Sequence, residues 1–563
     1  MLFQELHDDK DITNLKRVIT KDKSLYADIL RIRKTLNNPA YRTHSKRISD
    51  IEKQAEQEAK TKTPTNSELL ALYKERVTQG LETENPETEQ MLKRLKMRSN
   101  SGVAVISLLT KPYHCPGRCI YCPTEKNMPK SYLSKEPAAA RALANRFDPY
   151  KQIWSRLKAL SMNGHPIDKI EMIFIGGTWD YYPREYQEWF TAESFRACNN
   201  WGRPEKEHIK EGELSLTQLH AYNQNAEARI IGLSIETRPD YVNFAQLNWL
   251  RYLGVTKVEI GVQHLDNHVL EYNKREMTAE DCAAATETLR RAGFKLVYHM
   301  MPNLPESTEE KDIQMFRDLF NSPHHHPDMM KIYPCMILKG SVLYKWWSRG
   351  DIEYVPYDDA TLTRVLALCE REIPEYVRLI RVIRDIPADY IFASSRKSNL
   401  REVVDATQKE FGYAQRDIRA REIKDLEVVL EDFFLDTQIY NTETGTEHFI
   451  QFINADRKIA GFVRLRIPKE GSTTGFEQFP NLEVLIGAAI VRELHVYGTI
   501  RRIGEEGNQA QHVGFGKMLM AEAERQAKEA GLTKVAVIAG VGVRGYYAKI
   551  GYNLVGTYMV KML

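Results

Sequence analysis

The stretch His114-Cys115-Pro116-Gly117-Arg118-Cys119-Ile120-Tyr121-Cys122 carries three cysteines spaced C-x3-C-x2-C, with no fourth cysteine nearby. Three thiolates can hold three irons of a [4Fe-4S] cluster and leave the fourth iron open. An open iron can bind S-adenosylmethionine and pass it an electron, which makes a 5′-deoxyadenosyl radical. A structural zinc site normally has four ligands, so His114 would have to complete one. The cysteines Cys115, Cys119 and Cys122 therefore predict a radical cluster.

One short apolar run lies just before the cysteines. Similar runs recur after them, with helix-like segments between one run and the next. Short apolar runs of this kind are typical of strands buried in a parallel sheet. They cover residues 103–109, 170–175, 230–235, 257–262, 294–301 and 330–333. Strands that alternate with helices predict an α/β fold with right-handed crossovers, a partial or complete β/α barrel.

Polar residues follow these predicted strands, where the ligands of such barrels bind. Gly176 and Gly177 follow the second strand, Glu236 the third and Gln263 the fourth, and His299 ends the fifth. We expect Gly176, Gly177, Glu236 and Gln263 to bind S-adenosylmethionine. The alternative for Glu236 is a buried ion pair with Arg238.

The composition sets outer limits. A chain of 563 residues has room for several domains, and its net charge is only +3. The seven cysteines are odd in number and scattered apart from the cluster loop. Free thiols and an oxygen-sensitive cluster favour the reducing cytoplasm. No signal pattern opens the chain, and no apolar run approaches the roughly 20 residues of a membrane span, so we expect no membrane contact.

The N-terminal region is basic and is predicted to be helical. Ten Lys or Arg residues fall within 16–47, against two acidic residues, Asp22 and Asp28. A second basic group, Lys93 to Arg98, leads into the first strand, and Thr65 to Glu68 read as a capping box. A solvated helical face is one interpretation of the basic run. A one-sided excess of this size favours contact with a nucleic acid.

The C-terminal third changes to short strands and a glycine motif. Strands are predicted over 449–453, 459–467, the long run 482–497, and 535–539. Gln511-His512-Val513-Gly514-Phe515-Gly516-Lys517 opens a predicted helix, 518–530, in the Q/R-x-x-G-x-G form of GNAT-type acetyltransferases. Free amides at such a helix start bind the pyrophosphate of coenzyme A. The motif indicates acetyl-CoA binding, with a purely structural turn as the alternative.

Both motif sets occur together with longer stretches that carry a resemblance. These are Ser234 to Asp240, Glu259 to Gln263, Arg492 to Gly498 and the terminal Tyr558 to Leu563. From about Arg98 to its last residue, the chain resembles the Elongator protein 3 family, which comprises radical-SAM/acetyltransferase catalytic components of Elongator.

The resemblance implies a tRNA-modifying enzyme that forms 5-carboxymethyluridine at the wobble position, with acetyl-CoA as the carbon donor. The adenosyl radical would take hydrogen from the acetyl methyl group, and the carbon radical would add to C5 of the base. Thioester hydrolysis would then leave the carboxymethyl group. The implied partners are the tRNA anticodon stem-loop and an electron donor. Other Elongator subunits are possible, but the sequence does not imply them.

The resemblance also assigns residues to the acetyl-CoA site. Lys169, just before the second strand, matches a lysine of the radical domain assigned to acetyl-CoA, and Tyr546 would lie near the thioester. We expect both to take part in catalysis as well as in binding. An ordinary exposed lysine is the alternative for Lys169. The remaining matching positions are Glu493, Leu494, His495, Val496, Gly514, Phe515, Gly516 and Lys517.

The predicted organisation has four parts. They are a helical basic tRNA-binding region (1–97), a radical-SAM barrel (98–390), a linker (391–425) and a GNAT-type α+β domain (426–563). A protein lysine acetyltransferase with a structural cluster domain is the competing function, and it would need a general base, for which Glu493 is the candidate. A nucleic-acid-binding module without catalysis leaves both cofactor motifs unexplained.

Overall fold

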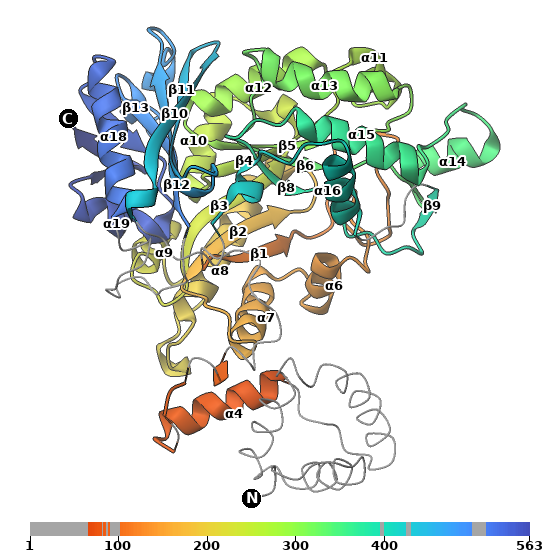
Figure 1. Ribbon diagram of the computed structural model, residues 1–563. Helices are drawn as coiled ribbons and strands as arrows, with labels where there is room; N and C mark the ends of the chain where they lie inside the picture. The colour runs from red at the N-terminus through yellow and green to blue at the C-terminus, as the bar shows by residue number, and fades with distance from the viewer. Residues whose placement is uncertain are drawn as a thin grey trace, which may run out of the picture. The chain divides into compact units, whose positions relative to one another are not determined.

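The computed structural model describes residues 66–81, 83–85, 88–89, 102–393, 399–423, 430–497 and 514–563 (Figure 1). The chain divides into two compact units, each described here by itself. The smaller contains residues 1–98 and 156–166, and the larger contains residues 99–155 and 167–563. Within the described residues, no helix has the length and apolar character that crossing a membrane requires.

In the smaller unit, helix α4 spans Asn66–Thr78. Leu69, Leu70 and Tyr73 form its apolar cluster, and the Tyr73 hydroxyl accepts a hydrogen bond from the Asn85 amide at 2.6 Å. The helix expected to open near residue 65 is therefore present from Asn66. The basic run 16–47 and the basic group 93–98 lie outside the described residues.

The larger unit contains a sheet of seven parallel strands in the order β1-β2-β3-β4-β5-β6-β8. All six strands predicted for a β/α barrel are confirmed, and β8 adds a seventh. β1 and β8 are the edges of the sheet, so the barrel is partial. The strands are β1 Ala104–Leu109, β2 Lys169–Ile175, β3 Arg229–Thr237, β4 Lys257–Gln263, β5 Lys295–Met300, β6 Met329–Ile332 and β8 Arg378–Arg381.

Helices cover the outer face of this sheet, where every second strand residue is apolar. Phe174 of β2 packs edge-on against Phe190 of α8, with ring centroids 4.9 Å apart. The Tyr298 hydroxyl of β5 hydrogen-bonds to Thr286 of α12. The helices between Pro137 and Arg371, of which α7 runs from the larger unit into the smaller one and α14 packs on β7 (Ile337–Leu338) instead of this sheet, are α6 Pro137–Ala144, α7 Pro149–Met162, α8 Arg184–Asn200, α9 Leu216–Asn223, α10 Phe244–Leu253, α11 Asn267–Tyr272, α12 Ala279–Arg291, α13 Glu309–Asn321, α14 Val342–Arg349 and α15 Asp359–Arg371.

Residues 391–425, expected to be a linker, contain regular structure in their described part. β9 (Ile391–Ala393) pairs with β7 (Ile337–Leu338) in a two-stranded sheet. Helices α16 (Leu400–Glu410) and α17 (Ile418–Arg421) follow.

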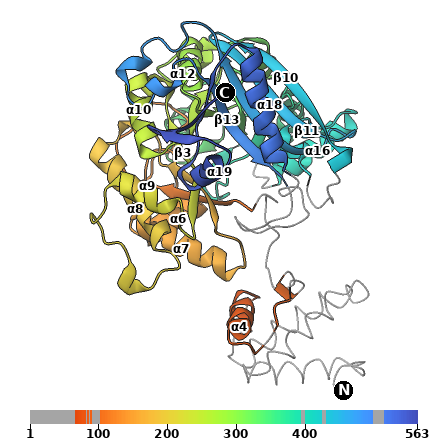
Figure 2. The ribbon, with the colours of Figure 1, turned by 90° about the vertical axis from the view of Figure 1, so that its left-hand side faces the viewer.

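A second seven-stranded sheet, in the order β10-β11-β12-β13-β14-β16-β15, forms the C-terminal part of the larger unit. Helix α18 (Phe515–Glu529) packs on β12 and β13 (Figure 2). The prediction of one long strand over 482–497 is wrong at its start, because Glu483–Leu485 form a 3-10 turn and β13 begins at Ala489. The strands are β10 Phe434–Thr442, β11 Gly445–Ile453, β12 Ile459–Pro468, β13 Ala489–Val496, β14 Lys534–Val537, β15 Asn553–Val555 and β16 Tyr558–Met562.

The two sheets of the larger unit are joined by buried arginines. Arg492 of β13 donates to both carboxylate oxygens of Asp328, at 2.8 and 3.0 Å, and Asp328 immediately precedes β6. Arg466 of β12 donates to Glu287 of α12 at 2.9 Å. The turn Val541–Val543 packs on the start of β3. The second sheet therefore meets the barrel at the amino ends of its strands.

Candidate active sites at the two ends of the barrel sheet

The cysteine loop follows β1 and places its three thiols close together. A hydrogen bond with Cys119 and burial raise the pKa of Cys122 well above its usual value, and the charges of Cys119 and Cys115 add to the rise. A hydrogen bond with Cys122 lowers the pKa of Cys119 well below its usual value, and Arg275 adds to this effect against the opposing effect of burial. The Arg275 guanidinium lies 3.6 Å from Cys119 Sγ. The Arg275 cation therefore favours the thiolate of Cys119, the form that binds iron.

The glycine pair lies beside this loop, and Gly176 leaves no room for a side chain. Gly176 and Gly177 have φ of +139° and +99°. A Cβ on Gly176 would meet Thr110 Oγ1 at 1.9 Å and the Thr110 amide nitrogen at 3.3 Å. Thr178, the next residue, lies 3.7 Å from Cys115 Sγ through its hydroxyl. The backbone after β2 is therefore open to close approach by a ligand of the cluster loop.

Glu236 and Gln263 also lie at the carboxyl ends of their strands. Glu236 accepts a hydrogen bond from the Tyr132 hydroxyl at 2.5 Å and lies 4.0 Å from the Lys331 ammonium. The alternative pairing of Glu236 with Arg238 is wrong, because Arg238 pairs with Asp240 at 2.9 Å. Gln263 has φ of +73°, and its buried Oε1 has no hydrogen-bond partner among the described residues.

A second carboxylate, Glu259 of β4, lies beside Glu236. His299 Nε2 is 2.8 Å from Glu259, and Lys331 forms an ion pair with the same carboxylate. Burial would raise the pKa of Glu259, but Lys331 and His299 hold it well below its usual value. The site at the carboxyl ends therefore contains ionised side chains next to the cysteine loop.

At the other end, α18 begins with Gly514, whose φ is +87° and which has no side chain to cap the helix. The amides of Phe515, Gly516 and Lys517 lie in the first turn, where no helical carbonyl can accept from them. A Cβ on Gly516 would lie 2.8 Å from Tyr546 Oη and 3.8 Å from a methyl group of Val496. The helix start, β13 and Tyr546 thus converge, as the acetyl-CoA motif predicts. Gln511, His512 and Val513 lie outside the described residues.

Strand β13 separates from β14 in this region. Their parallel pairing ends at Val491 and Val537, and an irregularity next to Arg464 leaves Arg492 without a paired residue in β12. Beyond that point, no described strand pairs with Glu493 and Leu494 on the β14 side. Main-chain groups at such a split are available to a ligand. His495 Nε2 and Tyr546 Oη are buried there without a hydrogen-bond partner among the described residues.

Glu493 is held by cations from both sheets. Arg464 of β12 donates to it at 2.9 Å, and the Lys295 ammonium at the start of β5 lies 3.9 Å away. Burial opposes ionisation, but Lys295 and Arg464 lower the pKa of Glu493 to about 2. Burial lowers the pKa of the neighbouring His495 to about 4. At neutral pH, Glu493 is thus an ionised structural carboxylate, and His495 is neutral.

Lys169 is the first residue of β2, at the amino end of the barrel sheet. It is half-buried, and burial lowers its pKa below the usual value while Asp168 opposes the shift. The seven residues of β2 span about 20 Å at 3.3 Å per residue. Lys169 therefore belongs to the end of the sheet that faces the acetyltransferase strands, and the cysteine loop lies at the opposite end.

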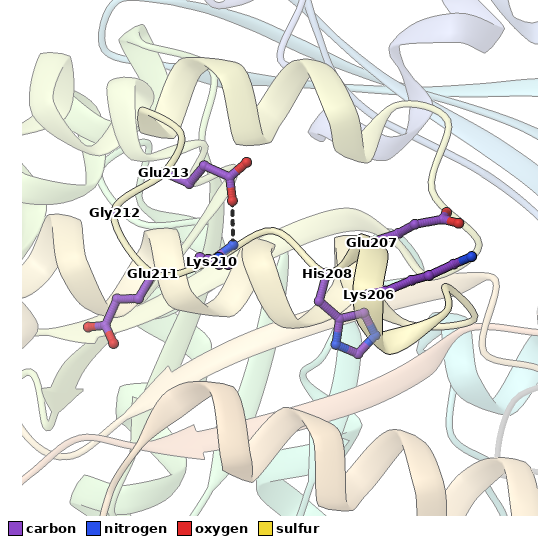
Figure 3. A pocket seen from close by; sticks show the side chains of 7 residues that line it. All are labelled: Lys206, Glu207, His208, Lys210, Glu211, Gly212 and Glu213. Atoms are coloured by element: carbon purple, nitrogen blue, oxygen red, sulfur yellow. Dashed lines mark hydrogen bonds between the residues drawn. The ribbon is translucent and has the colours of Figure 1, made fainter.

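A surface pocket lies between the 3-10 turn Glu205–Glu207 and α9 (Figure 3). Two of its polar groups bond within their own loop, while the Glu211 carboxylate accepts from the Trp189 indole of α8 at 2.9 Å. The Lys210 amide donates to Glu213 at 2.7 Å, and the His208 ring bonds to the Arg203 carbonyl at 3.0 Å. It contains none of the predicted site residues. The lining residues are Lys206, Glu207, His208, Lys210, Glu211, Gly212 and Glu213.

Several residues of the sites were not among the predicted ones. Arg275 beside Cys119, Tyr132 beside Glu236 and Lys331 beside Glu259 come from distant parts of the chain. One sequence signal was available for Lys331, since a lysine inside an otherwise apolar buried strand requires a partner. The sequence around Arg275 and Tyr132 offered no such signal.

Fold and site together define the class: a radical-SAM barrel joined to an acetyltransferase-type sheet. The family model described as the Radical SAM superfamily matches residues 110–319, and that of the Radical_SAM C-terminal domain matches residues 327–410. Members of this superfamily use a [4Fe-4S] cluster and S-adenosylmethionine, and the three cysteines fit the cluster.

Individual relatives match most of the chain. The "tRNA uridine(34) acetyltransferase" of Methanocaldococcus infernus is 38% identical over 516 residues, covering 89% of this chain and 92% of the relative. The protein of the same name from Dehalococcoides mccartyi is 39% identical, covering 83% and 99%. Human "Elongator complex protein 3" is 37% identical, covering 84% and 86%.

A solved structure agrees with these matches. The archaeal Methanocaldococcus infernus Elp3 with an N-terminal deletion superposes with a TM-score of 0.69 at 36% identity, covering 82% of this chain and all of that one. The chain belongs to the Elongator protein 3 family.

Proposed function

We propose that this enzyme forms 5-carboxymethyluridine at the wobble position of tRNA, with acetyl-CoA as carbon donor and radical-SAM chemistry as the means. One observation carries the proposal: the residues predicted to hold the cluster and those predicted to bind acetyl-CoA lie near opposite ends of the barrel strands, in one compact unit. The relatives named "tRNA uridine(34) acetyltransferase" support uridine 34 as the target.

In this proposal, Cys115, Cys119 and Cys122 hold the cluster, and Arg275 keeps Cys119 in its thiolate form. Bound there, the cluster and S-adenosylmethionine supply an adenosyl radical that removes hydrogen from an acetyl methyl group. Gly176 and Gly177 let S-adenosylmethionine approach the backbone, while Glu236 and Gln263 offer oxygen acceptors to its polar groups.

The acetyl-CoA site would be built from main-chain groups. Amides of Phe515 to Lys517 bind the pyrophosphate at the helix start, with Gly514 and Gly516 allowing close approach. Glu493 to Val496 contact the pantetheine arm through the backbone. The Tyr546 hydroxyl and the neutral His495 ring are buried polar groups available to the thioester. Lys169, at the same end of the sheet, would contact the acyl-CoA.

The remaining partners are proposals of the same kind. The anticodon stem-loop would bind at the carboxyl ends of the barrel strands, and residues 1–97 would hold its phosphates. An electron donor reduces the cluster, and the reaction takes place in the reducing cytoplasm. The four-part division at residues 97, 390 and 425 is part of this proposal.

Protein lysine acetylation is disfavoured by the state of Glu493. A general base for an amine works best with a pKa near the working pH. Glu493 has a pKa of about 2 and is bound to Arg464 and Lys295. A carboxylate so placed is a poor base at neutral pH.

The experiment is nucleoside mass spectrometry on tRNA treated with reduced enzyme, S-adenosylmethionine and acetyl-CoA labelled at the methyl carbon. We expect the label in 5-carboxymethyluridine, and we expect no product when any component is omitted or Cys119 is replaced by Ala. Unmodified uridine, together with cluster-independent acetylation of a protein lysine, would establish the competing function.

A further inference from the structure

Ionisable side chains line the inner face of the barrel sheet. Strand side chains alternate, so the residues on the face opposite the helices are every second one. The interior of such a barrel is normally filled by branched apolar side chains. Here the inner positions include Glu171 of β2, Lys257 and Glu259 of β4, Lys295 and His299 of β5, and Lys331 of β6.

Strand pairing arranges these residues in layers. Lys257 pairs with Lys295 in the lowest layer of β4 and β5. Glu259 pairs with Glu236 in the next layer, and His299 pairs with Lys331 in the layer above. Successive layers lie about 7 Å apart, since two residues separate them along each strand.

The lowest layer contacts the acetyltransferase strand directly. Lys295 lies 3.9 Å from Glu493 of β13, and Lys257 forms an ion pair with Glu171. Lys295 also acts electrostatically on Glu171 and on His495, so these groups share one region. The buried Nε2 of His495 has no partner there among the described residues.

The upper layers continue to the radical site. Ser234 donates to Glu259 at 3.2 Å, and His299 bonds to it at 2.8 Å. Lys331 bridges Glu259 and Glu236, and Glu236 accepts from Tyr132. Ion pairs thus follow one another from β13 to the carboxyl ends of the strands.

Burying this row of ion pairs costs free energy. Removing an ion from water costs several kcal/mol, and replacing a buried ion pair by apolar residues is often neutral or stabilising. A barrel that needed only stability would fill its interior with apolar side chains. Buried ionisable groups with strongly shifted states cluster at functional sites.

We propose that this row of ion pairs binds an acetate-sized carboxylate and passes it from the acetyl-CoA strand to the radical site. Lys295, Lys257 and Lys331 each lie beside a glutamate carboxylate, and the end of that side chain is chemically an acetate. An incoming acetate can therefore exchange with each glutamate in turn. The inference rests on the proposed function and adds the route between its two sites.

The chemistry before transit is a hydrolysis, which in this route precedes radical formation, whereas the family resemblance implies that hydrolysis follows addition to the base. Water adds to the acetyl carbonyl, the carbon–sulfur bond breaks, and coenzyme A leaves as the thiol with one of the water protons. The other proton is released, which leaves acetate. Its methyl group would then reach the radical site, where loss of one hydrogen atom to the adenosyl radical would give the carbon radical that adds to C5 of the base. The base radical so formed would give up one electron, which the oxidised cluster can accept, and lose the C5 proton, which restores the double bond.

The test uses the full chain with Lys257→Met, which keeps length but removes the ammonium, and Lys295→Met as a second variant. We expect acetyl-CoA hydrolysis and S-adenosylmethionine cleavage within twofold of wild type, with product formation lowered at least tenfold. Millimolar labelled acetate, added directly, should restore product because it enters from the open carboxyl end. Binding of labelled acetate, followed by NMR line broadening without added cofactors, should weaken at least tenfold.

Controls separate the possible causes. Lys257→Arg should behave like wild type, and Arg196→Met removes a comparable half-buried ion pair, with Glu193 on α8, outside the row. Normal product in both Met variants would overturn the inference. So would failure of wild type to use acetate while it uses acetyl-CoA, or failure of acetate to restore the variants. Absence of product from wild type with acetyl-CoA would instead overturn the proposed function.

Discussion

Glu493 lies in a motif that matches a cofactor site, and its side chain also stabilises the contact between the two sheets. Its backbone belongs to the split between β13 and β14, where a ligand can reach main-chain groups. Its side chain points to Arg464 and Lys295, one cation from each sheet. The backbone is available to acetyl-CoA, and the carboxylate ties the acetyltransferase strand to the barrel.

Glu370 on α15 gives a pH prediction. It is buried, Gln408 donates to it at 3.0 Å, and burial raises its pKa to about 8. The unfolded chain loses this proton near pH 4.5. Between these values the native state binds the extra proton, so the free energy of unfolding falls as pH rises, by up to about 1.4 kcal/mol per pH unit.

Glu370→Gln should remove that fall, because the amide cannot ionise. Urea denaturation of both proteins from pH 5 to pH 9 measures it, and the variant should be the more stable one at pH 8. If the free energy of unfolding changed with pH in the same way for both proteins, Glu370 would already be ionised in the native state.

At the residue scale, sequence spacing predicted the candidate site residues wherever those residues are close together in the chain. Three cysteines in one loop and the glycines of one helix start could be predicted because each set is contiguous. The partner of Glu236 could not be predicted. Arg238, close in sequence, turns to Asp240, while Tyr132 and Lys331 come from segments about a hundred residues away on either side.

At the scale of elements, the proposed binding of acetyl-CoA at the start of α18 can be tested by adding one methyl group there. Gly516→Ala places a Cβ 2.8 Å from Tyr546 Oη, which forces the ring away from the first turn. We expect the dissociation constant of acetyl-CoA to rise about tenfold, or ~1.4 kcal/mol, by calorimetry. Iron content should be unchanged.

Gly545→Ala is the matched control on α19 (Arg544–Lys549), since a Cβ there has open space around it. It should bind acetyl-CoA as wild type does. Equal weakening in both variants would mean that the effect is one of general stability.

Element prediction succeeded for the barrel because its strands are continuous apolar runs between helices. Among the described residues, the strands it missed are β7, β8, β9, β10, β15 and β16. β8 is four residues with an arginine at each end, and β15 is an exposed three-residue strand. Short, polar or edge strands are defined by their neighbours in the sheet, which a single sequence does not display. The basic run 16–47 lies outside the described residues, so its role stays a prediction.

At the scale of the larger unit, Asp328 ties its two sheets together. It is fully buried and accepts from Arg492, while the backbone amide of Leu296 also donates to it at 2.9 Å. Asp328→Ala removes the carboxylate that Arg492 binds through both oxygens and leaves it only Glu447, 3.4 Å away, so we expect a loss of about 3–5 kcal/mol in the free energy of unfolding.

Calorimetry should show the two sheets of wild type unfolding together and those of Asp328→Ala in two separate transitions. The conservative Asp328→Asn keeps one oxygen for Arg492, so its free energy of unfolding should fall by less than that of Asp328→Ala. A single unshifted transition in the Ala variant would mean that other contacts join the sheets.

The buried arginines between the sheets also limit how this gene can change over evolutionary time. A catalytic module joined by a flexible tether can be lost, duplicated or exchanged between genes with little harm to its neighbour. Here Arg464, Arg466 and Arg492 reach from one sheet to carboxylates or carbonyls of the other. Recombination that separated the halves would leave each with unpaired charges on a formerly dry surface. The two activities must therefore be inherited as one.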